Sequence, residues 1–165
     1  MHLLLPPEVV SQLVEALAQA RTREIGGILM GEHIGVDTFK VKELTIQRKG
    51  GTFAAFIRIV AEILVPLRAF FDATRHDYTK FNYLGEWHSH HSFALEPSDR
   101  DHMTMYDIVM DPQLGAHFVV LLLIKLNDKG QLDGSVTVYQ PNKSPFKGNL
   151  AFAQQPPVIA PVKSY

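Results

Sequence analysis

Apolar residues recur three or four positions apart in two long segments of the chain, which is the spacing of an amphipathic helix. In residues 7–21, which begin at a proline pair suited to a helix start, these positions are Val10, Leu13, Val14 and Leu17. In residues 60–76, where Pro66 lies near the expected first turn, they are Ile63, Leu64, Leu67, Phe70 and Phe71. A shorter helix is predicted over residues 98–110, with Ile108 and Val109 on its apolar face.

Short apolar or alternating runs bounded by glycine or polar residues predict the strands. These runs cover residues 24–31, 36–46, 53–59, 81–90, 116–126 and 135–140, with turns at Gly35 and at residues 49–51. The last two runs are expected to pair as a hairpin. Helices and strands interspersed in this way predict a mixed α/β layer fold.

The composition changes at Pro141, because five prolines fall in residues 141–165 and little periodicity remains there. We therefore expect one domain over residues 1–140, followed by a proline-rich C-terminal tail over residues 141–165. A chain of 165 residues with 46% hydrophobic residues is large and apolar enough to bury a core of its own.

Charge and residue usage exclude several classes of partner and chemistry. Lysine and arginine number 16 against 17 acidic residues, so no basic excess favours nucleic acid or a membrane surface. The apolar start lacks the basic flank of a signal peptide, and the longest apolar run, residues 118–124, is too short to span a bilayer. A soluble, cytoplasmic protein is expected. Cysteine is absent, which leaves histidine, aspartate and glutamate as metal ligands.

Four of the eight histidines lie in the stretch YLGEWHSHHSFALEPSDRDHM, residues 83–103. His88 and His90 stand two apart at the end of a predicted strand, so both side chains point to the same face. Asp101, eleven residues after His90, falls in the first turn of the following helix, where it could complete a metal site of the kind that zinc prefers. The alternative is a pair of surface histidines beside a capping box formed by Ser98 and Asp101.

The ordered set His88-Ser89-His90, seven residues, Ser98, two residues, Asp101 resembles the JAMM motif of the JAB/MPN metalloprotease family, H-S-H-x7-S-x2-D, at every defined position. That family also has an upstream E-x-x-G-x-L-x-G strand, matched here by Glu24, Gly27, Leu29 and Gly31. The resemblance covers roughly residues 3–140. It implies a single mixed, largely antiparallel β-sheet flanked by helices, the MPN/JAB architecture, which is cytidine-deaminase-like.

The resemblance also implies a role for each matched side chain. His88, His90 and Asp101 would hold one catalytic Zn²⁺ and leave one position open to water, whose pKa the ion lowers. Glu24 would be the general acid and base that moves the water's proton to the leaving amine. Ser98 would donate a hydrogen bond to the oxyanion, with a purely structural N-cap as the alternative. Glu32 and Glu86 are rival carboxylates for the role of base, but only Glu24 occupies the family's position.

Family members with the full ligand set typically cleave after the C-terminal glycine of ubiquitin or a ubiquitin-like protein, with the extended tail lying beside a strand edge. The compact chain resembles stand-alone prokaryotic members, which accompany ubiquitin-like modifiers and their operon-encoded conjugation enzymes, in some cases in antiviral operons. We therefore expect a deubiquitinase-like isopeptidase with a ubiquitin-like protein substrate. Two alternatives stay open: a non-catalytic MPN partner-binding module, and a metallopeptidase acting on a sulfur-carrier protein or a small peptide.

Several nearby residues are expected to have no catalytic role. His91 stands where the family commonly has proline, and we expect an ordinary exposed histidine, with a substrate contact or a spare metal ligand as alternatives. Trp87 should point to the opposite strand face and join the core. His102 and His117 have no motif support. The basic residues are expected to be solvated, although some could contact an acidic partner surface: Arg21, Arg23, Arg48, Lys49 and Arg58.

Overall fold

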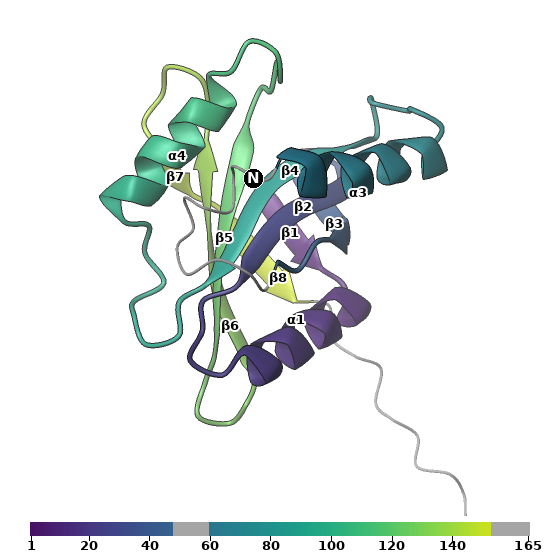
Figure 1. Ribbon diagram of the computed structural model, residues 1–165. Coiled ribbons are helices and arrows are strands. Elements are labelled where there is room, and N and C mark those ends of the chain that lie inside the picture. Colours follow the sequence, from purple (N-terminus) through teal and green to yellow (C-terminus); the bar gives the residue numbers. More distant parts are fainter. Residues whose placement is uncertain (48–59, 153–165) are drawn as a thin grey trace, which may run out of the picture.

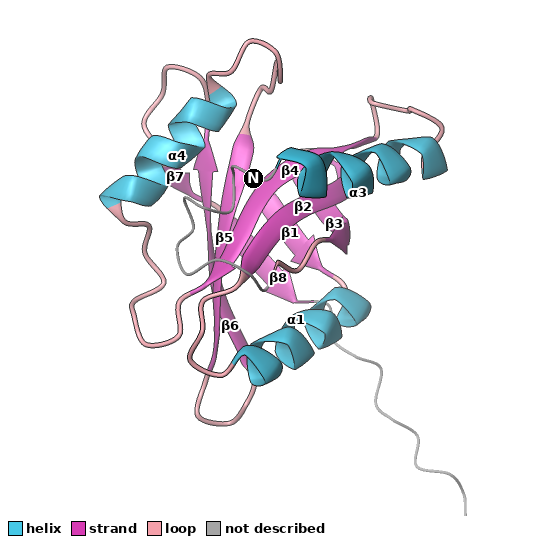
Figure 2. Ribbon diagram, in the orientation of Figure 1, coloured by secondary structure: helices cyan, strands magenta, loops and turns pink. Residues whose placement is uncertain are grey.

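The computed structural model describes residues 1–47 and 60–152, which form one mixed sheet with helices on both faces (Figures 1 and 2). The helices are α1 (Pro7–Ala20), α3 (Val60–Ala73) and α4 (Asp99–Val109). The strands are β1 (His2–Leu5), β2 (Gly26–Gly35), β3 (Thr38–Leu44), β4 (Phe81–Ser89), β5 (Val119–Leu126), β6 (Leu132–Tyr139), β7 (Phe146–Lys147) and β8 (Asn149–Phe152). No helix among these residues is long and apolar enough to cross a membrane.

The strands follow the order β7-β6-β5-β4-β2-β3-β1-β8. The pairs β2–β3, β2–β4, β5–β6 and β6–β7 are antiparallel, whereas β1–β3, β1–β8 and β4–β5 are parallel. The predicted α/β class with a mixed, largely antiparallel sheet is therefore confirmed. Strand β4 lies in the middle of the order, so the residues at its end are held by a neighbour on each side.

Alternation along β5 shows how the sheet separates two apolar layers. Val120, Leu122 and Ile124 pack in the cluster that contains the buried face of α1. The intervening residues Val119, Leu121 and Leu123 pack with Met105 and Val109 of α4. On the same side as α4, Phe70 of α3 packs against Ile28 and Met30 of β2. Helix α1 thus covers one face, and α3 and α4 cover the other (Figure 2).

A bulge in β4 orients the residues that follow it. Leu29 of β2 pairs with Gly85 and Met30 pairs with Tyr83, so Leu84 is an extra residue in β4. Gly85 has φ +145, and a Cβ atom there would collide with the backbone of Val120 on β5. Only glycine meets both conditions. Beyond the bulge, Trp87 faces the α1 side, where it is fully buried and donates its Nε1 hydrogen to the Thr45 carbonyl at 2.9 Å, as predicted for a core residue.

Sequence analysis missed strands near both ends of the described chain. The start was interpreted only as an apolar run, yet it forms β1, which pairs in parallel with both β3 and β8 and buries Leu3 and Leu5. Part of the predicted tail, residues 146–152, forms β7 and β8 and belongs to the sheet. Strands β1 and β8 form by pairing with strands distant in sequence, which periodicity does not reveal, whereas β7 is a two-residue strand paired with the neighbouring β6. The predicted strand 53–59 and the turn 49–51 lie outside the described residues, as does the end of the chain from 153 onward.

The other elements lie close to their predicted bounds. Two details differ: β2 continues to Gly35, where a turn was predicted, and Pro66 lies well inside α3 rather than near its first turn. Helix α4 begins after Ser98 and ends at Val109, as its start signal and apolar face predicted.

Candidate metal centre

The candidate site lies where β4 ends, facing the side of the sheet that α4 covers. His88 is the last residue but one of β4, and its backbone is aligned with Gly26 of β2 and Leu123 of β5. His90 follows the strand, and its N–H donates to the Ile124 carbonyl at 2.9 Å. The strand therefore stays paired on both sides up to the site. This arrangement excludes β4 as the free strand edge expected beside the metal.

Asp101 reaches the histidines from the first turn of α4. The Ser98 Oγ accepts a hydrogen bond from the Asp101 N–H at 3.2 Å, and the Asp101 Oδ2 accepts from the Ser98 N–H at 2.8 Å, which completes a capping box. The Ser98 hydroxyl also donates to Oδ2 at 2.8 Å. With Oδ2 occupied, Oδ1 is the oxygen that faces His88, at 3.7 Å from its Nε2. One carboxylate therefore takes part in the capping box and still offers a second oxygen as a potential metal ligand, although the sequence presented these as alternatives.

Three potential ligand atoms, one from each of His88, His90 and Asp101, lie within 4.8 Å of one another. The two Nε2 atoms are 3.0 Å apart. Ligands of a tetrahedral zinc ion with bonds near 2.0 Å stand about 3.3 Å from each other. Two of the three separations, 3.0 and 3.7 Å, bracket that value, the third lies within 4.8 Å, and two imidazoles with one carboxylate form a donor set that zinc accepts. The residues therefore fit the ion that the motif implies.

Hydrogen bonding fixes the tautomer of His90, and burial favours the neutral form of His88, which is the form that binds a metal. The Nδ1 of His90 lies 2.6 Å from the Ala94 carbonyl, which can only accept, so Nδ1 carries the proton and Nε2 keeps its lone pair. His88 is 5% exposed, and burial is the main cause that lowers its pKa to about 4; the charge of Asp101 opposes this shift and that of His90 adds to it. A neutral imidazole is the form that binds metal.

Glu24 comes to the same site from the connection between α1 and β2. It lines a groove of about 500 Å³ together with His88, His90, Ser98 and Asp101. Neither rival carboxylate lines this groove. Glu32 lies at the other end of β2, where Lys80 and Lys42 pair with it at 3.0 and 3.9 Å.

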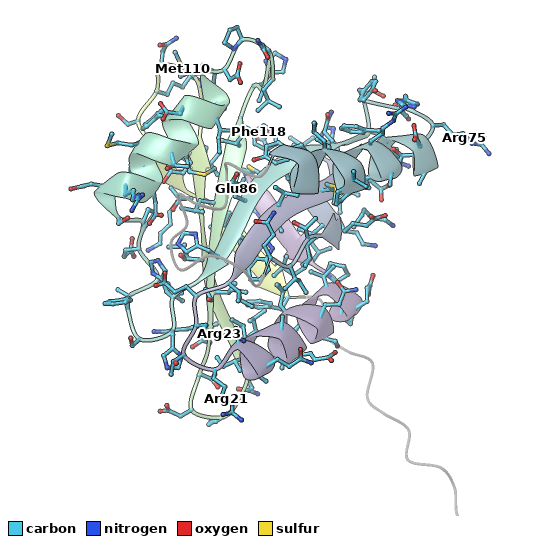
Figure 3. All side chains as sticks on the ribbon, in the orientation of Figure 1. Arg21, Arg23, Arg75, Glu86, Met110 and Phe118 are labelled. Carbon is cyan, nitrogen blue, oxygen red and sulfur yellow. The ribbon has the colours of Figure 1, made fainter. Side chains whose placement is uncertain are left out.

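Glu86, the other rival, points to the same side of β4 as His88 but is buried in the sheet between α3 and α4 (Figure 3). Burial raises its pKa to about 8, although a hydrogen bond from Tyr83 opposes the shift. The same burial, with the nearby Glu86 carboxyl, raises the pKa of the Tyr83 hydroxyl well above its usual value. This pair is an internal structural contact rather than part of the groove.

The outer wall of the groove is the loop between β4 and α4, and sequence analysis missed it. Phe93, Ala94, Glu96 and Arg100 line the groove. Three distant side chains hold this loop: Lys125 donates to the Phe93 carbonyl at 3.4 Å, Ser135 donates to the Leu95 carbonyl at 2.5 Å, and Lys147 pairs with Glu96 at 2.7 Å. These contacts join positions far apart in sequence, so no local pattern could have identified them.

The other histidines of the stretch stand apart from the ligand cluster. His91 is exposed, as expected, and lines a separate pocket behind β4. The Nδ1 of His102 hydrogen bonds with the Tyr139 hydroxyl at 2.9 Å. Neither contributes to the group of potential metal ligands found among the described residues.

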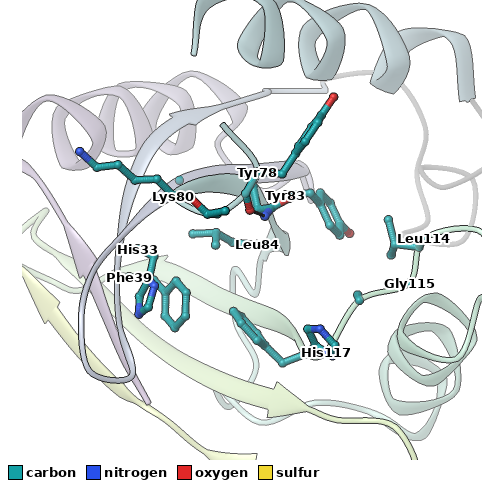
Figure 4. A pocket seen from close by; sticks show the side chains of 14 residues that line it. His33, Phe39, Tyr78, Lys80, Tyr83, Leu84, Leu114, Gly115 and His117 are labelled. Atoms are coloured by element: carbon teal, nitrogen blue, oxygen red, sulfur yellow. Dashed lines mark hydrogen bonds between the residues drawn. The ribbon is translucent and has the colours of Figure 1, made fainter. Parts of the chain in front are cut away.

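A second cavity, of about 280 Å³, lies at the opposite end of β4 (Figure 4). His33 stacks on Phe39 at one wall, with ring centroids 4.8 Å apart, and His117 lines the same space. Two of the polar groups in the lining have partners within the protein: Lys80 pairs with Glu32, and the Asn82 amide donates to the Tyr78 carbonyl at 2.6 Å. This cavity holds none of the predicted site residues.

Comparison with known proteins agrees with this geometry. A family profile described as prokaryotic homologs of the JAB domain matches residues 6–132. The solution structure of a protein from Desulfitobacterium hafniense superposes with a TM-score of 0.62 at 15% sequence identity, covering 93% of this chain and 94% of that one. At that identity the likeness shows the fold alone. No curated protein matches the sequence.

Proposed function

Because this chain belongs to the family of prokaryotic JAB-domain homologs, we propose that it is a zinc-dependent peptidase that cleaves after the C-terminal glycine of a ubiquitin-like protein. The observation that carries the proposal is the convergence of His88, His90 and Asp101 on one point, with Glu24 on the same groove. A module that only binds a partner would need neither three converging metal ligands nor a carboxylate on the same groove.

The chain's own residues supply the steps around the metal. When bound, zinc supplies Lewis acidity and brings the pKa of water towards neutrality. Glu24 accepts a proton from the water that attacks the carbonyl carbon, and it returns that proton to the nitrogen as the C–N bond breaks. Ser98 holds Asp101 through Oδ2, so its first task is to orient a ligand. To donate to an oxyanion as well, its hydroxyl must turn away from Asp101.

The groove, rather than a strand edge, is where the substrate tail would lie. Strand β4 is paired with β2 and β5 up to His88, so an added strand cannot pair with it there. The loop wall at Phe93 and Ala94 and the start of α4 leave an open channel towards the ligand cluster. A glycine next to the scissile bond lets the tail approach closely, since it has no side chain to exclude.

The test is incubation of the zinc-loaded protein with ubiquitin-like proteins from its own genome, each fused through its C-terminal glycine to a reporter. Mass spectrometry should show cleavage directly after that glycine, blocked by a zinc chelator. Glu24→Gln should lower kcat roughly 10²- to 10⁴-fold with zinc content unchanged, because a proton shuttle acts only in the chemical step.

The matched control is Glu32→Gln, which removes a carboxylate remote from the groove and should keep wild-type kcat. Binding of a fusion without cleavage, in protein that holds zinc, would reject the peptidase and leave a partner-binding module. Full activity in Glu24→Gln would reject Glu24 as the base.

A further inference from the structure

The middle residue of the His88-Ser89-His90 motif, Ser89, does not line the metal groove. It is the last residue of β4 and is only 2% exposed. Side chains alternate along a strand, so Ser89 points to the α1 face together with Trp87, while His88 points to the opposite face. A buried hydroxyl normally has a hydrogen-bond partner, and the partner of Ser89 indicates what the residue does.

That partner is the backbone of Ile25, the residue that follows Glu24. The Ser89 Oγ accepts a hydrogen bond from the Ile25 N–H at 3.0 Å, and the Ser89 N–H donates to the Ile25 carbonyl at 2.8 Å. In a regular antiparallel pair, two residues exchange both hydrogen bonds through their main chains. Here the side chain of Ser89 replaces its carbonyl as one of the two acceptors. The hydroxyl thus extends the pairing of β2 and β4 by one residue, next to Glu24.

Close packing fixes the same segment against the strand that carries the ligands. Gly26 is aligned with His88, and a Cβ atom on Gly26 would collide with the Trp87 carbonyl oxygen and the His88 Cβ. On its other side, the Gly26 carbonyl accepts from the Gln47 N–H at 2.8 Å. The Ile25 side chain is 1% exposed and packs in the core on the α1 side. The backbone from Ile25 onward is therefore fixed relative to His88.

Glu24 lies at the exposed end of this fixed segment. Its side chain is exposed and lines the metal groove, and β2 begins only at Gly26. The Ile25 N–H belongs to the planar peptide group that begins at the Glu24 Cα. A hydrogen bond to this N–H fixes the orientation of that plane. It thereby fixes the direction in which the Glu24 side chain leaves the backbone.

We propose that Ser89 is a positioning residue for Glu24, which it holds towards the metal groove through the Ile25 N–H. The proposal rests on the proposed peptidase function, in which Glu24 moves the proton. Without the hydroxyl, the Ile25 N–H is left buried without its acceptor, and the Glu24–Ile25 peptide plane loses its anchor. A proton shuttle must lie within hydrogen-bonding reach of the water, and a misplacement of about 1 Å can cost roughly 10²-fold in rate.

The hydrogen bond is tested first by amide exchange, followed by NMR, which needs no substrate. Ser89→Ala should speed exchange of the Ile25 N–H roughly tenfold. Ser89→Thr keeps the acceptor, and its extra methyl group can enter the cavity of about 200 Å³ that Ser89 lines together with Leu17. Ser89→Val has the shape of the threonine variant without the acceptor, so it should exchange as fast as Ser89→Ala. Equal exchange in Ser89→Thr and Ser89→Val would overturn the proposal.

Thr45→Val is the matched control, because Thr45 makes the same pair of bonds on the other edge of β2. The Thr45 Oγ1 accepts from the Ile28 N–H at 3.0 Å, and the Thr45 N–H donates to the Ile28 carbonyl at 3.1 Å. This pair lies three residues beyond Ile25. Thr45→Val should lower the melting temperature, as Ser89→Val does, but keep wild-type kcat. An equal loss of kcat in both variants would show that any loosening of β2 impairs turnover, which would overturn the proposal.

Turnover separates positioning of the base from support of the metal. Ser89→Ala and Ser89→Val should lower kcat roughly 10- to 100-fold with KM unchanged, and Ser89→Thr should stay near the wild type. Zinc content should not change, because His90 is held by its own bonds to the Ile124 and Ala94 carbonyls. A loss of kcat that disappears when zinc is added would assign Ser89 to the histidines and overturn the proposal.

A double variant tests whether Ser89 acts through Glu24. Adding Ser89→Ala to Glu24→Gln should lower kcat no further, because residues that act as one unit are not additive. If Ser89→Ala lowers kcat by the same factor with Glu24 and with Gln at position 24, Ser89 has a separate role and the proposal fails.

The position of Glu24 can also be measured without turnover, which keeps this test apart from the peptidase proposal. Absence of cleavage for every fusion would reject the peptidase. Co²⁺ can then replace Zn²⁺, and the paramagnetic relaxation of the Glu24 carboxyl carbon, which falls steeply with distance from the ion, is measured by NMR. In Ser89→Val, a shift of about 1 Å away from the groove should lower this relaxation roughly twofold, while Ser89→Thr and Thr45→Val keep the wild-type value. Equal relaxation in all four proteins would overturn the positioning role of Ser89.

Discussion

The two ends of β4 both carry titratable side chains beside a cavity, but those side chains are satisfied in different ways. At the Phe81 end, Lys80 pairs with Glu32, and the Tyr78 hydroxyl hydrogen bonds with His76 at 2.7 Å. At the Ser89 end, three ligand atoms of different residues face one point. The side chains at the Phe81 end pair with one another, whereas those at the Ser89 end form a group that could hold a metal ion. Convergent donor atoms, not the presence of a cavity, identify the functional end.

The largest expected difference between the two ends is their response to zinc. Excess zinc should stabilise the wild-type protein by about 4 kcal/mol at a thousandfold excess over the dissociation constant, because only the folded state presents the site. His88→Ala should lose this stabilisation and all turnover, since it leaves two ligands. His117→Ala, in the remote cavity, should keep both. Thermal denaturation with and without zinc measures this stabilisation. Equal loss of zinc stabilisation in His88→Ala and His117→Ala would contradict the assignment of zinc binding to the Ser89 end.

A smaller effect concerns Glu86, which lies between the two ends. A carboxyl with a raised folded-state pKa holds its proton more tightly when folded, so its stabilising contribution is complete below about pH 4.5 and is lost as the pH rises through about 8. In chelator-treated protein, Glu86→Gln should match the wild type near pH 4.5 and exceed it by about 3 kcal/mol near pH 7.5.

Urea denaturation at several pH values measures the difference. A constant offset between Glu86→Gln and the wild type across this range would contradict the raised pKa of Glu86, because only a titrating group makes the offset depend on pH.

The smallest expected effect belongs to Ser98. Ser98→Ala removes the cap of α4 and should lower the free energy of unfolding by about 1 kcal/mol. Because Ser98 also holds Asp101 Oδ2, zinc affinity should fall roughly tenfold. Turnover of Ser98→Ala measured at saturating zinc shows whether the Ser98 hydroxyl also stabilises the oxyanion, apart from its effect on zinc affinity. Unchanged kcat there would restrict Ser98 to positioning, and unchanged zinc affinity would show that Asp101 needs no support from it.

Local signals predicted much of this structure. Helix α1 ends one residue before its expected end, because its apolar stripe and proline start act within the segment itself. The cluster of His88, His90 and Asp101 followed from motif spacing, since a strand end and a helix start place these residues within a short stretch. Strands β1 and β8 were missed because they pair with strands distant in sequence: β1 with β3 and β8, and β8 with β1. The groove wall was missed for the same reason: Ser135 and Lys147, far along the chain, hold it in place.

The central claim is that His88, His90 and Asp101 together hold one zinc ion. Elemental analysis of untagged protein, purified without added metal and again after reconstitution, tests it most directly. We expect about one zinc per chain in the wild type, in Glu24→Gln and in His117→Ala, and almost none in His90→Ala, because a site reduced to two ligands binds zinc weakly. Less than about a third of a zinc per chain with no gain on reconstitution, or the same content in His90→Ala as in the wild type, would contradict the account.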